Sequence, residues 1–189
     1  MKTLPCLALC AAALAACSPS AASDTENATP LPRRYAYPRF QPYDTTTVPR
    51  RVADLTFRLN AAAHTTEPRQ GWMNISYPRY GATLHLSYTH PAGPQAIDNR
   101  RERMMLNLGE AVAEASDYLT PAGFECRELV AVDALVTPVQ FIALGPGDRM
   151  VSGAVVLSDA EASADSIAPI VAALQAEVRT LLQSLAVEK

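Results

Sequence analysis

The sequence is poor in the residue types that most often carry out reactions. It contains three histidines, four cysteines and one tryptophan in 189 residues. His64, His85 and His90 do not have the spacing of metal ligands, and no HExxH or CxxC motif occurs. Walker loops, GxSxG elbows and GxGxxG turns are absent too, which excludes the enzyme classes that these motifs define. We therefore predict no catalytic residue, no metal site and no cofactor.

A surplus of positive charge is also lacking. The chain has 16 basic and 19 acidic residues, which gives a net charge of −3. Proteins that bind nucleic acids by charge present a strongly basic surface. The composition therefore predicts no nucleic-acid partner.

No apolar run is long enough to span a bilayer, but a short one opens the chain. Met1–Thr3 is basic, Leu4–Ala16 is small and apolar, and Leu14-Ala15-Ala16-Cys17 has the pattern of a bacterial lipobox. We predict that residues 1–16 form a lipoprotein signal peptide and that Cys17 carries the lipid. An ordinary signal peptide that happens to precede a cysteine is the alternative. The predicted product is exported and anchored to a membrane by lipid.

This processing leaves a single free cysteine. Cys6 and Cys10 depart with the signal peptide and Cys17 is lipidated, so Cys126 has no partner for an intramolecular disulfide. A lone cysteine next to apolar residues is more often a small buried hydrophobe than a nucleophile. We predict the former for Cys126.

Two extended segments follow the lipid site. Residues 17–30 are rich in Ser, Ala and Thr and are predicted to form a flexible tether. Residues 31–51 contain four prolines that forbid a helix and favour an extended arm. Tyr and Arg alternate in this arm and are residue types that anchor interfaces, although the arm could instead pack on its own domain. The candidate partner contacts in the arm are Arg33, Tyr35, Tyr37 and Arg39.

The clearest structural signal is an alternating stretch at residues 72–88. Apolar and polar residues alternate on either side of Pro78–Gly81, which predicts a β-hairpin. The hairpin supplies three further candidate contacts, namely Arg79, Tyr80 and His85. A strand at residues 55–59 is predicted to precede it.

The remaining sequence predicts helices and strands in separate groups. Apolar residues recur at helical spacing over residues 97–119 and again over residues 162–187. Short apolar runs between residues 124 and 157 are separated by turns and indicate three strands in a meander. The order predicts a single α+β domain at residues 31–189, with an antiparallel sheet of five or six strands and two helices packed on it.

Several of these stretches occur in the order of a known family. They are the lipobox at 14–17, Arg34–Arg39 with Tyr43-Asp44, Trp72–Tyr88, Thr137–Phe141 with Ser152–Ala154, and Asp165–Pro169. In these stretches the chain resembles the gliding motility-associated lipoprotein GldD family of Bacteroidota.

This resemblance implies a function that residue chemistry alone does not indicate. It implies an accessory lipoprotein of the gliding motility and type 9 secretion machinery, which acts by protein–protein contacts and is not an enzyme. Its partners would be other lipoproteins or envelope proteins of that machinery. We expect the protein at the outer membrane, facing the periplasm, rather than at the inner membrane. The alternative is a periplasmic lipoprotein that binds a small molecule or a cell-wall fragment.

Overall fold

The computed structural model describes residues 41–132, 134, 136–158 and 164–188. These residues belong to one compact unit, Arg39–Lys189. The predicted signal peptide, the lipid site Cys17, the tether at residues 17–30 and the first part of the arm, residues 31–40, lie outside the described residues.

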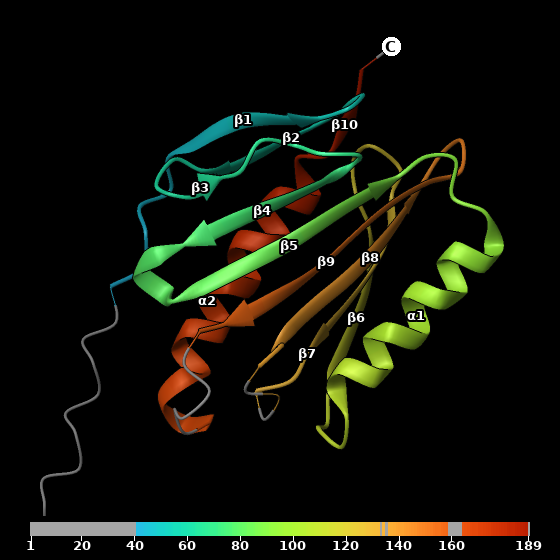
Figure 1. Ribbon diagram of the computed structural model, residues 1–189. Helices are drawn as coiled ribbons and strands as arrows, with labels where there is room; N and C mark the ends of the chain where they lie inside the picture. Colours follow the sequence, from blue (N-terminus) through green and yellow to red (C-terminus); the bar gives the residue numbers. More distant parts are fainter. Residues whose placement is uncertain (1–40, 133, 135, 159–163, 189) are drawn as a thin grey trace, which may run out of the picture. The chain divides into compact units, whose positions relative to one another are not determined.

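The described chain is an α+β fold with two antiparallel sheets (Figure 1). A three-stranded sheet has the order β1-β2-β10, and a seven-stranded sheet has the order β3-β4-β5-β9-β8-β7-β6. The strands are β1 (Thr47–Val52), β2 (Leu55–Asn60), β3 (His64–Thr65), β4 (Trp72–Tyr77), β5 (Ala82–Thr89), β6 (Glu114–Leu119), β7 (Glu125–Val130), β8 (Val139–Gly145), β9 (Arg149–Leu157) and β10 (Ala186–Val187). The helices are α1 (Pro94–Leu108), α2 (Ala164–Gln183) and the short 3-10 turn η1 (Pro78–Tyr80).

The α+β class and the antiparallel pairing are as predicted, but five or six strands were too few. Strands β3 and β10 have two residues each, which is too short to show a period of two. Strand β1 lies in the proline-rich arm, where Pro49 sits on an edge strand. Within the described part of the arm, residues 47–51 are thus extended, as expected, and are paired in a sheet.

The predicted hairpin and meander are confirmed. In β4, Met73, Ile75 and Tyr77 are buried while Trp72 is exposed. Residues that alternate along the sequence therefore lie on opposite faces of the sheet, one buried and one exposed. Strand β4 pairs with β5 from Trp72↔Ser87 to Tyr77↔Ala82. The three predicted strands between residues 124 and 157 are β7, β8 and β9, each antiparallel to the next.

The first helix ends earlier than its sequence pattern predicts. Instead of running to residue 119, α1 stops at Leu108, and Gly109 follows with φ +58°. A glycine at positive φ is a common helix terminator, and here it frees the following residues to pair with β7. Residues 114–119 form the edge strand β6, so Leu119 is not in a helical stripe and its side chain is 66% exposed.

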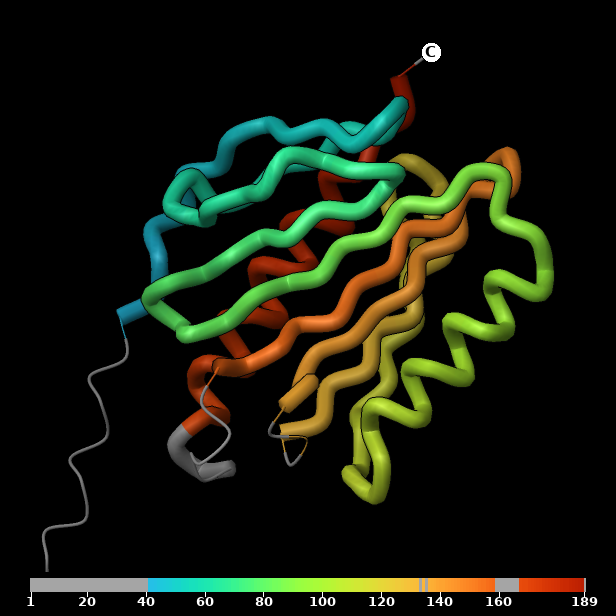
Figure 2. Tube along the Cα trace, viewed as in Figure 1, coloured from blue at the N-terminus to red at the C-terminus, as the bar shows by residue number. Residues whose placement is uncertain are grey.

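Each face of the seven-stranded sheet has its own apolar cluster. Figure 2 shows the course of the chain through the sheet and the two helices. On one face α2 and the small sheet share the larger cluster, with Phe57 from β2, Phe141 from β8 and Leu174 from α2 all buried. On the other face α1 packs on β7, β8 and β9 through Met104 and Leu108. The second helix is shorter than predicted, because the chain leaves it at Gln183 and returns to β2 as β10.

A buried carboxylate fastens α2 to the large sheet. The side chain of Glu128 on β7 is fully buried, and Arg179 of α2 lies 3.2 Å from its carboxylate. Gln175 of α2 and the hydroxyl of Tyr118 on β6 donate hydrogen bonds to the same carboxylate. A buried charge is tolerated only when it is paired and hydrogen-bonded, so these partners depend on one another.

We predict that replacing Arg179 by methionine lowers the free energy of unfolding by about 3 kcal/mol, because it leaves the Glu128 carboxylate buried without its counter-charge. The loss should be much smaller in a Glu128→Gln background, where no buried charge remains. Arg127→Met is the control, since the Arg127–Asp117 pair is exposed and its loss should cost less than about 1 kcal/mol. Urea denaturation of the four variants measures these differences, and equal losses in both backgrounds would contradict the prediction.

Gly71, which directly precedes β4, allows the backbone to approach β5 closely. Gly71 has φ +83°, and a Cβ atom at this position would collide with the carbonyl oxygen of Tyr88. Gly81 also has a positive φ, but a Cβ atom there would meet nothing. A substitution at Gly81 therefore tests backbone strain alone, whereas a substitution at Gly71 tests backbone strain together with steric collision.

Gly81→Ala should reduce the free energy of unfolding by about 1 kcal/mol, which is the cost of a left-handed backbone for an L-residue. Gly71→Ala should cost several times more, because β4 and β5 must separate locally to admit the methyl group. Chemical denaturation measures both. Similar losses for the two variants would show that the contact with Tyr88 is easily relieved.

Candidate interaction surface on the hairpin

The outer face of the β4–β5 hairpin is a polar surface with one large aromatic side chain. We define this hairpin surface by the residues that alternate with the buried ones: Trp72, Asn74, Ser76, Thr83, His85 and Ser87. Trp72 is 46% exposed and lies across from Ser87. Asn74 and His85 face each other and form a hydrogen bond of 2.7 Å between Oδ1 and Nδ1. The surface thus combines an exposed indole with side chains already fixed in place.

The hairpin surface stays exposed because α1 lies over a different part of the sheet. The cluster under α1 is formed with β7, β8 and β9 and contains no residue of β4 or β5. Arg100 of α1 reaches only as far as β9, where its guanidinium donates to the carbonyl of Gly153. In Figure 1, α1 lies beside β8 and β6, away from β4. Among the described residues, no helix therefore covers this face of β4 and β5.

The turn of the hairpin instead holds the arm. The backbone N–H of Tyr43 donates to the hydroxyl of Tyr80, and the backbone N–H of Arg79 donates to the hydroxyl of Tyr43. The Arg79 guanidinium lies 4.6 Å from the centre of the Tyr43 ring and donates to the carbonyl of Pro42. These reciprocal bonds fix residues 41–46 on the domain, in agreement with the alternative in which the arm packs on its own fold.

The predicted contact residues have different fates. Tyr80 is only 5% exposed and stacks in the core, so it does not present its ring to a partner, contrary to expectation. Arg79 is exposed but already engaged by the arm, and His85 is exposed on the hairpin surface. Arg33, Tyr35, Tyr37 and Arg39 lie outside the described residues, as does Cys17, and their roles stay predictions.

Trp72 is the contact candidate that sequence reasoning passed over. The signal was present: Trp72 occupies the polar register of its strand, together with Asn74 and Ser76. An apolar side chain in a polar register is either covered by another element or exposed, and only the position of α1 decides which. The other strongly exposed apolar side chains among the described residues are Met105, Leu106, Val112, Leu119 and Val136.

A small hollow lies where the arm crosses α2. It has a volume of about 220 Å³ and is lined by residues that include Tyr43, Asn60, Tyr80 and Glu177. Burial raises the pKa of Glu177, and a hydrogen bond from Asn60 partly opposes this effect. The hollow is smaller than the pockets that usually bind drug-sized molecules.

We predict that Glu177→Gln stabilises the protein at neutral pH. Because the pKa of Glu177 is raised in the folded state, folding favours the protonated carboxyl and opposes its ionisation. The stability penalty is therefore absent at acidic pH and appears as the pH rises through the folded pKa. Thermal unfolding should show a higher melting temperature for Glu177→Gln at about pH 7 and no difference at about pH 3.

Glu110 is exposed and lies outside the hollow, so Glu110→Gln is the matched control. It also removes a carboxylate and should leave the melting temperature unchanged at both pH values. A stabilisation by Glu177→Gln that is the same at both pH values would rule out the ionisation mechanism.

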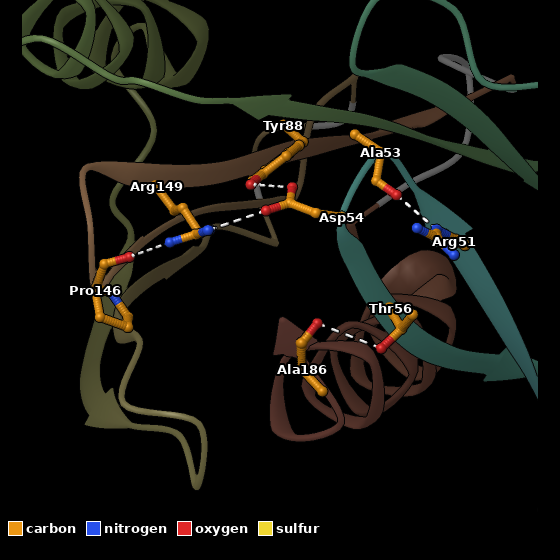
Figure 3. Close-up of polar contacts among 8 residues, drawn as sticks. All are labelled: Arg51, Ala53, Asp54, Thr56, Tyr88, Pro146, Arg149 and Ala186. Carbon is orange, nitrogen blue, oxygen red and sulfur yellow. Dashed lines mark hydrogen bonds and ion pairs between the residues drawn. The ribbon is translucent and has the colours of Figure 1, made fainter. Parts of the chain in front are cut away.

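A second charged group joins the two sheets. Figure 3 shows Asp54, which follows β1, between Tyr88 of β5 and Arg149 of β9. The Tyr88 hydroxyl donates to Oδ1 of Asp54 at 2.6 Å, and the Arg149 guanidinium lies 3.0 Å from Oδ2. The bond from Tyr88 and the pairing with Arg149 lower the pKa of Asp54, while burial raises the pKa of Tyr88 to about 12. These groups are therefore held in the charge states that tie the sheets together.

Cys126 is buried, as predicted, and burial raises the pKa of its thiol to about 12. Such a thiol stays protonated at neutral pH and is a poor nucleophile. Among the described residues no group of three His, Cys, Asp or Glu side chains could hold a metal ion. No described helix is long and apolar enough to cross a membrane. Comparison with protein-family models and with curated proteins gives no match to this chain.

Proposed function

We propose that this protein is a membrane-anchored accessory lipoprotein of the gliding motility and type 9 secretion machinery, and that it acts by binding other envelope proteins. The observation that carries the proposal is the hairpin surface, where Trp72 is exposed on a strand and not covered by α1. The family resemblance of the sequence supplies the identity of the machinery.

Trp72 has the properties of an interface anchor. Tryptophan contributes a large apolar area with few rotatable bonds, and it is enriched among the residues that dominate binding energy. Its neighbours are held by main-chain pairing with β5 and by the Asn74–His85 hydrogen bond. A surface that is already ordered loses little conformational entropy when a partner binds.

The charged groups of the domain support a non-catalytic role. Glu128 fastens α2 to the large sheet, and Asp54 joins the two sheets. Both are satisfied by partners within the fold, which is the arrangement expected of groups that stabilise a structure. In the proposed protein, Cys17 carries the lipid, residues 17–30 span the distance from the membrane, and the domain presents the hairpin surface to the periplasm at the outer membrane.

We predict that Trp72→Ala abolishes the capture of partner proteins without unfolding the domain. The experiment is a crosslinking pull-down of the tagged full-length protein from its native cells, compared with the Trp72→Ala and Cys17→Ala variants. Wild type should enrich lipoproteins or envelope proteins of the secretion machinery. Both variants should lose most of them, the first through its surface and the second through its anchor.

Leu106→Ala is the matched control, since Leu106 is an apolar side chain that is 72% exposed on α1 and outside the hairpin surface. It should retain the partners. If Trp72→Ala captures the same proteins as wild type, the hairpin surface is not the docking site. If wild type enriches no protein of the secretion machinery, the functional assignment itself fails.

The alternative function is the binding of a small molecule or a cell-wall fragment. The hollow beside Glu177 is the feature that favours it, because a carboxylate, an amide and two tyrosines converge there. Its volume of about 220 Å³ allows only a small group to enter. This reading would be preferred if wild type captured no protein and Glu177→Gln changed the retention of envelope fragments.

A further inference from the structure

Strand β6 forms one edge of the seven-stranded sheet. It pairs with β7 along all six of its residues, from Glu114↔Val130 to Leu119↔Glu125, and has no strand on its other side within the described residues. Alternate residues of an edge strand direct their N–H and C=O groups outward, where another strand can bind them. Soluble proteins often protect such an edge with charged side chains, proline or a bulge. Strand β6 has no lysine, proline or bulge, and its charged residues are Glu114 and Asp117.

Hollows lined by both apolar and polar side chains lie beside β6 on both faces of the sheet. On the α2 side, a hollow of about 270 Å³ is lined by residues that include Val112, Val130 and Ala172. On the α1 side, a hollow of about 520 Å³ is lined by residues that include Leu119, Ile142 and Leu144. A strand added to β6 would direct its side chains alternately toward these two hollows.

We propose that the partner of β6 is a second copy of this chain, and that two β6 strands pair antiparallel about a two-fold axis. Such an axis keeps the same face of the sheet on the same side in both copies. Residues that lie opposite each other must then have side chains on the same face, so the axis passes between one residue and its own copy. Only axes at Ser116 or Asp117 align most of the strand. The axis at Asp117 would place two carboxylates opposite each other, which is unfavourable. The axis at Ser116 places small hydroxyl side chains together instead.

Charge complementarity favours the axis at Ser116. In this register Glu114 lies opposite the partner's Tyr118, on the face that carries α2. Arg179 of α2 reaches the same region, with its guanidinium 3.5 Å from the hydroxyl of Ser116, and its side chain is 47% exposed. Glu114 is exposed and has no ion pair among the described residues. In each copy the exposed carboxylate of Glu114 would therefore lie opposite Tyr118 of the other copy, near the half-exposed guanidinium of Arg179, which is also paired with Glu128.

The dimer leaves the hairpin surface accessible. Strand β6 and the β4–β5 hairpin lie toward opposite ends of the strand order, with β7, β8 and β9 between them. The inference does not depend on the proposed function, because it uses only the edge, its hollows and its charges. A protein with this dimer would present two hairpin surfaces.

The test is a symmetric disulfide at the axis. Residues directly opposite each other on paired antiparallel strands have Cα atoms about 4.5 to 5.5 Å apart, within the range that a disulfide spans. The full-length Ser116→Cys protein, purified in detergent and mildly oxidised, should migrate mostly as a covalent homodimer on a non-reducing gel. Wild type is the control for the other cysteines. Cys126 is buried, and the predicted processing removes Cys6 and Cys10 and lipidates Cys17, so wild type should remain monomeric on this gel.

Ala115→Cys is the matched control on the neighbouring residue. Across the proposed axis the two Ala115 Cα atoms would be about 8 Å apart, because the strands are about 4.8 Å apart and the residues are offset by two positions. This distance is too long for a disulfide. Equal crosslinking of both variants would indicate random collision or another register, and, if oxidation is performed in whole cells before purification, a Ser116→Cys adduct with a different protein would indicate a different occupant. Either result overturns the proposal.

The mass of the uncrosslinked protein gives an independent measurement. Analytical ultracentrifugation of wild type in detergent should show a dimer, and Glu114→Arg should weaken its association by about tenfold or more, because it places like charges opposite each other. Glu110→Arg makes the same change of charge outside β6 and should leave the dimer intact. A wild type that sediments as a monomer overturns the proposal even if Ser116→Cys folds poorly.

Discussion

A seven-stranded sheet is wider than the single helix that this chain places on one of its faces. With strands about 4.8 Å apart, seven strands span about 29 Å, whereas a helix with its side chains is about 10 to 12 Å wide. On one face, the small sheet and α2 together cover the strands and share the larger apolar cluster. On the other side α1 covers β7, β8 and β9, and the hairpin is left exposed. The accessibility of the hairpin surface follows from this mismatch in width.

The polar groups in the interior are used to hold layers together. Glu128 links β7 to α2, Asp54 links the turn after β1 to β5 and β9, and the Tyr43–Tyr80 pair links the arm to the hairpin. Each of these groups is satisfied by neighbours from a distant part of the sequence. A domain that fixes its charges in this way is well suited to present a rigid surface, and rigidity is what the hairpin surface needs in order to bind without a large entropic cost.

The two proposals assign different parts of the sheet to different partners. The hairpin surface, at one side of the strand order, would dock envelope proteins, and the β6 edge, at the other side, would join two copies of the chain. Pairing two copies would double the number of hairpin surfaces in each assembly. If the partner is itself repeated, binding at two points increases the apparent affinity without any new contact.

The sequence by itself determined the local elements whose patterns were strong. The alternation at residues 72–88 predicted the hairpin, and the three apolar runs after residue 124 predicted the meander. It also predicted that Cys126 is buried. The predictions of the hairpin and the meander succeeded because each rests on the period of the side chains along one short stretch, whereas the prediction for Cys126 rests on residue type.

The tertiary structure decided what local periodicity does not record. Residues 114–119 fit a helical stripe, yet Gly109 ends α1 and pairing with β7 makes them a strand. The strands β3 and β10 are too short to have a pattern and exist because longer strands, β4 and β2, offer them hydrogen bonds. Tyr80, a predicted partner contact, is buried, and Trp72, for which no role was predicted, is exposed, since exposure depends on which element lies above a residue. Packing between distant segments decides which element lies there. The free energy of that packing depends on several segments together and cannot be read from the sequence of one of them.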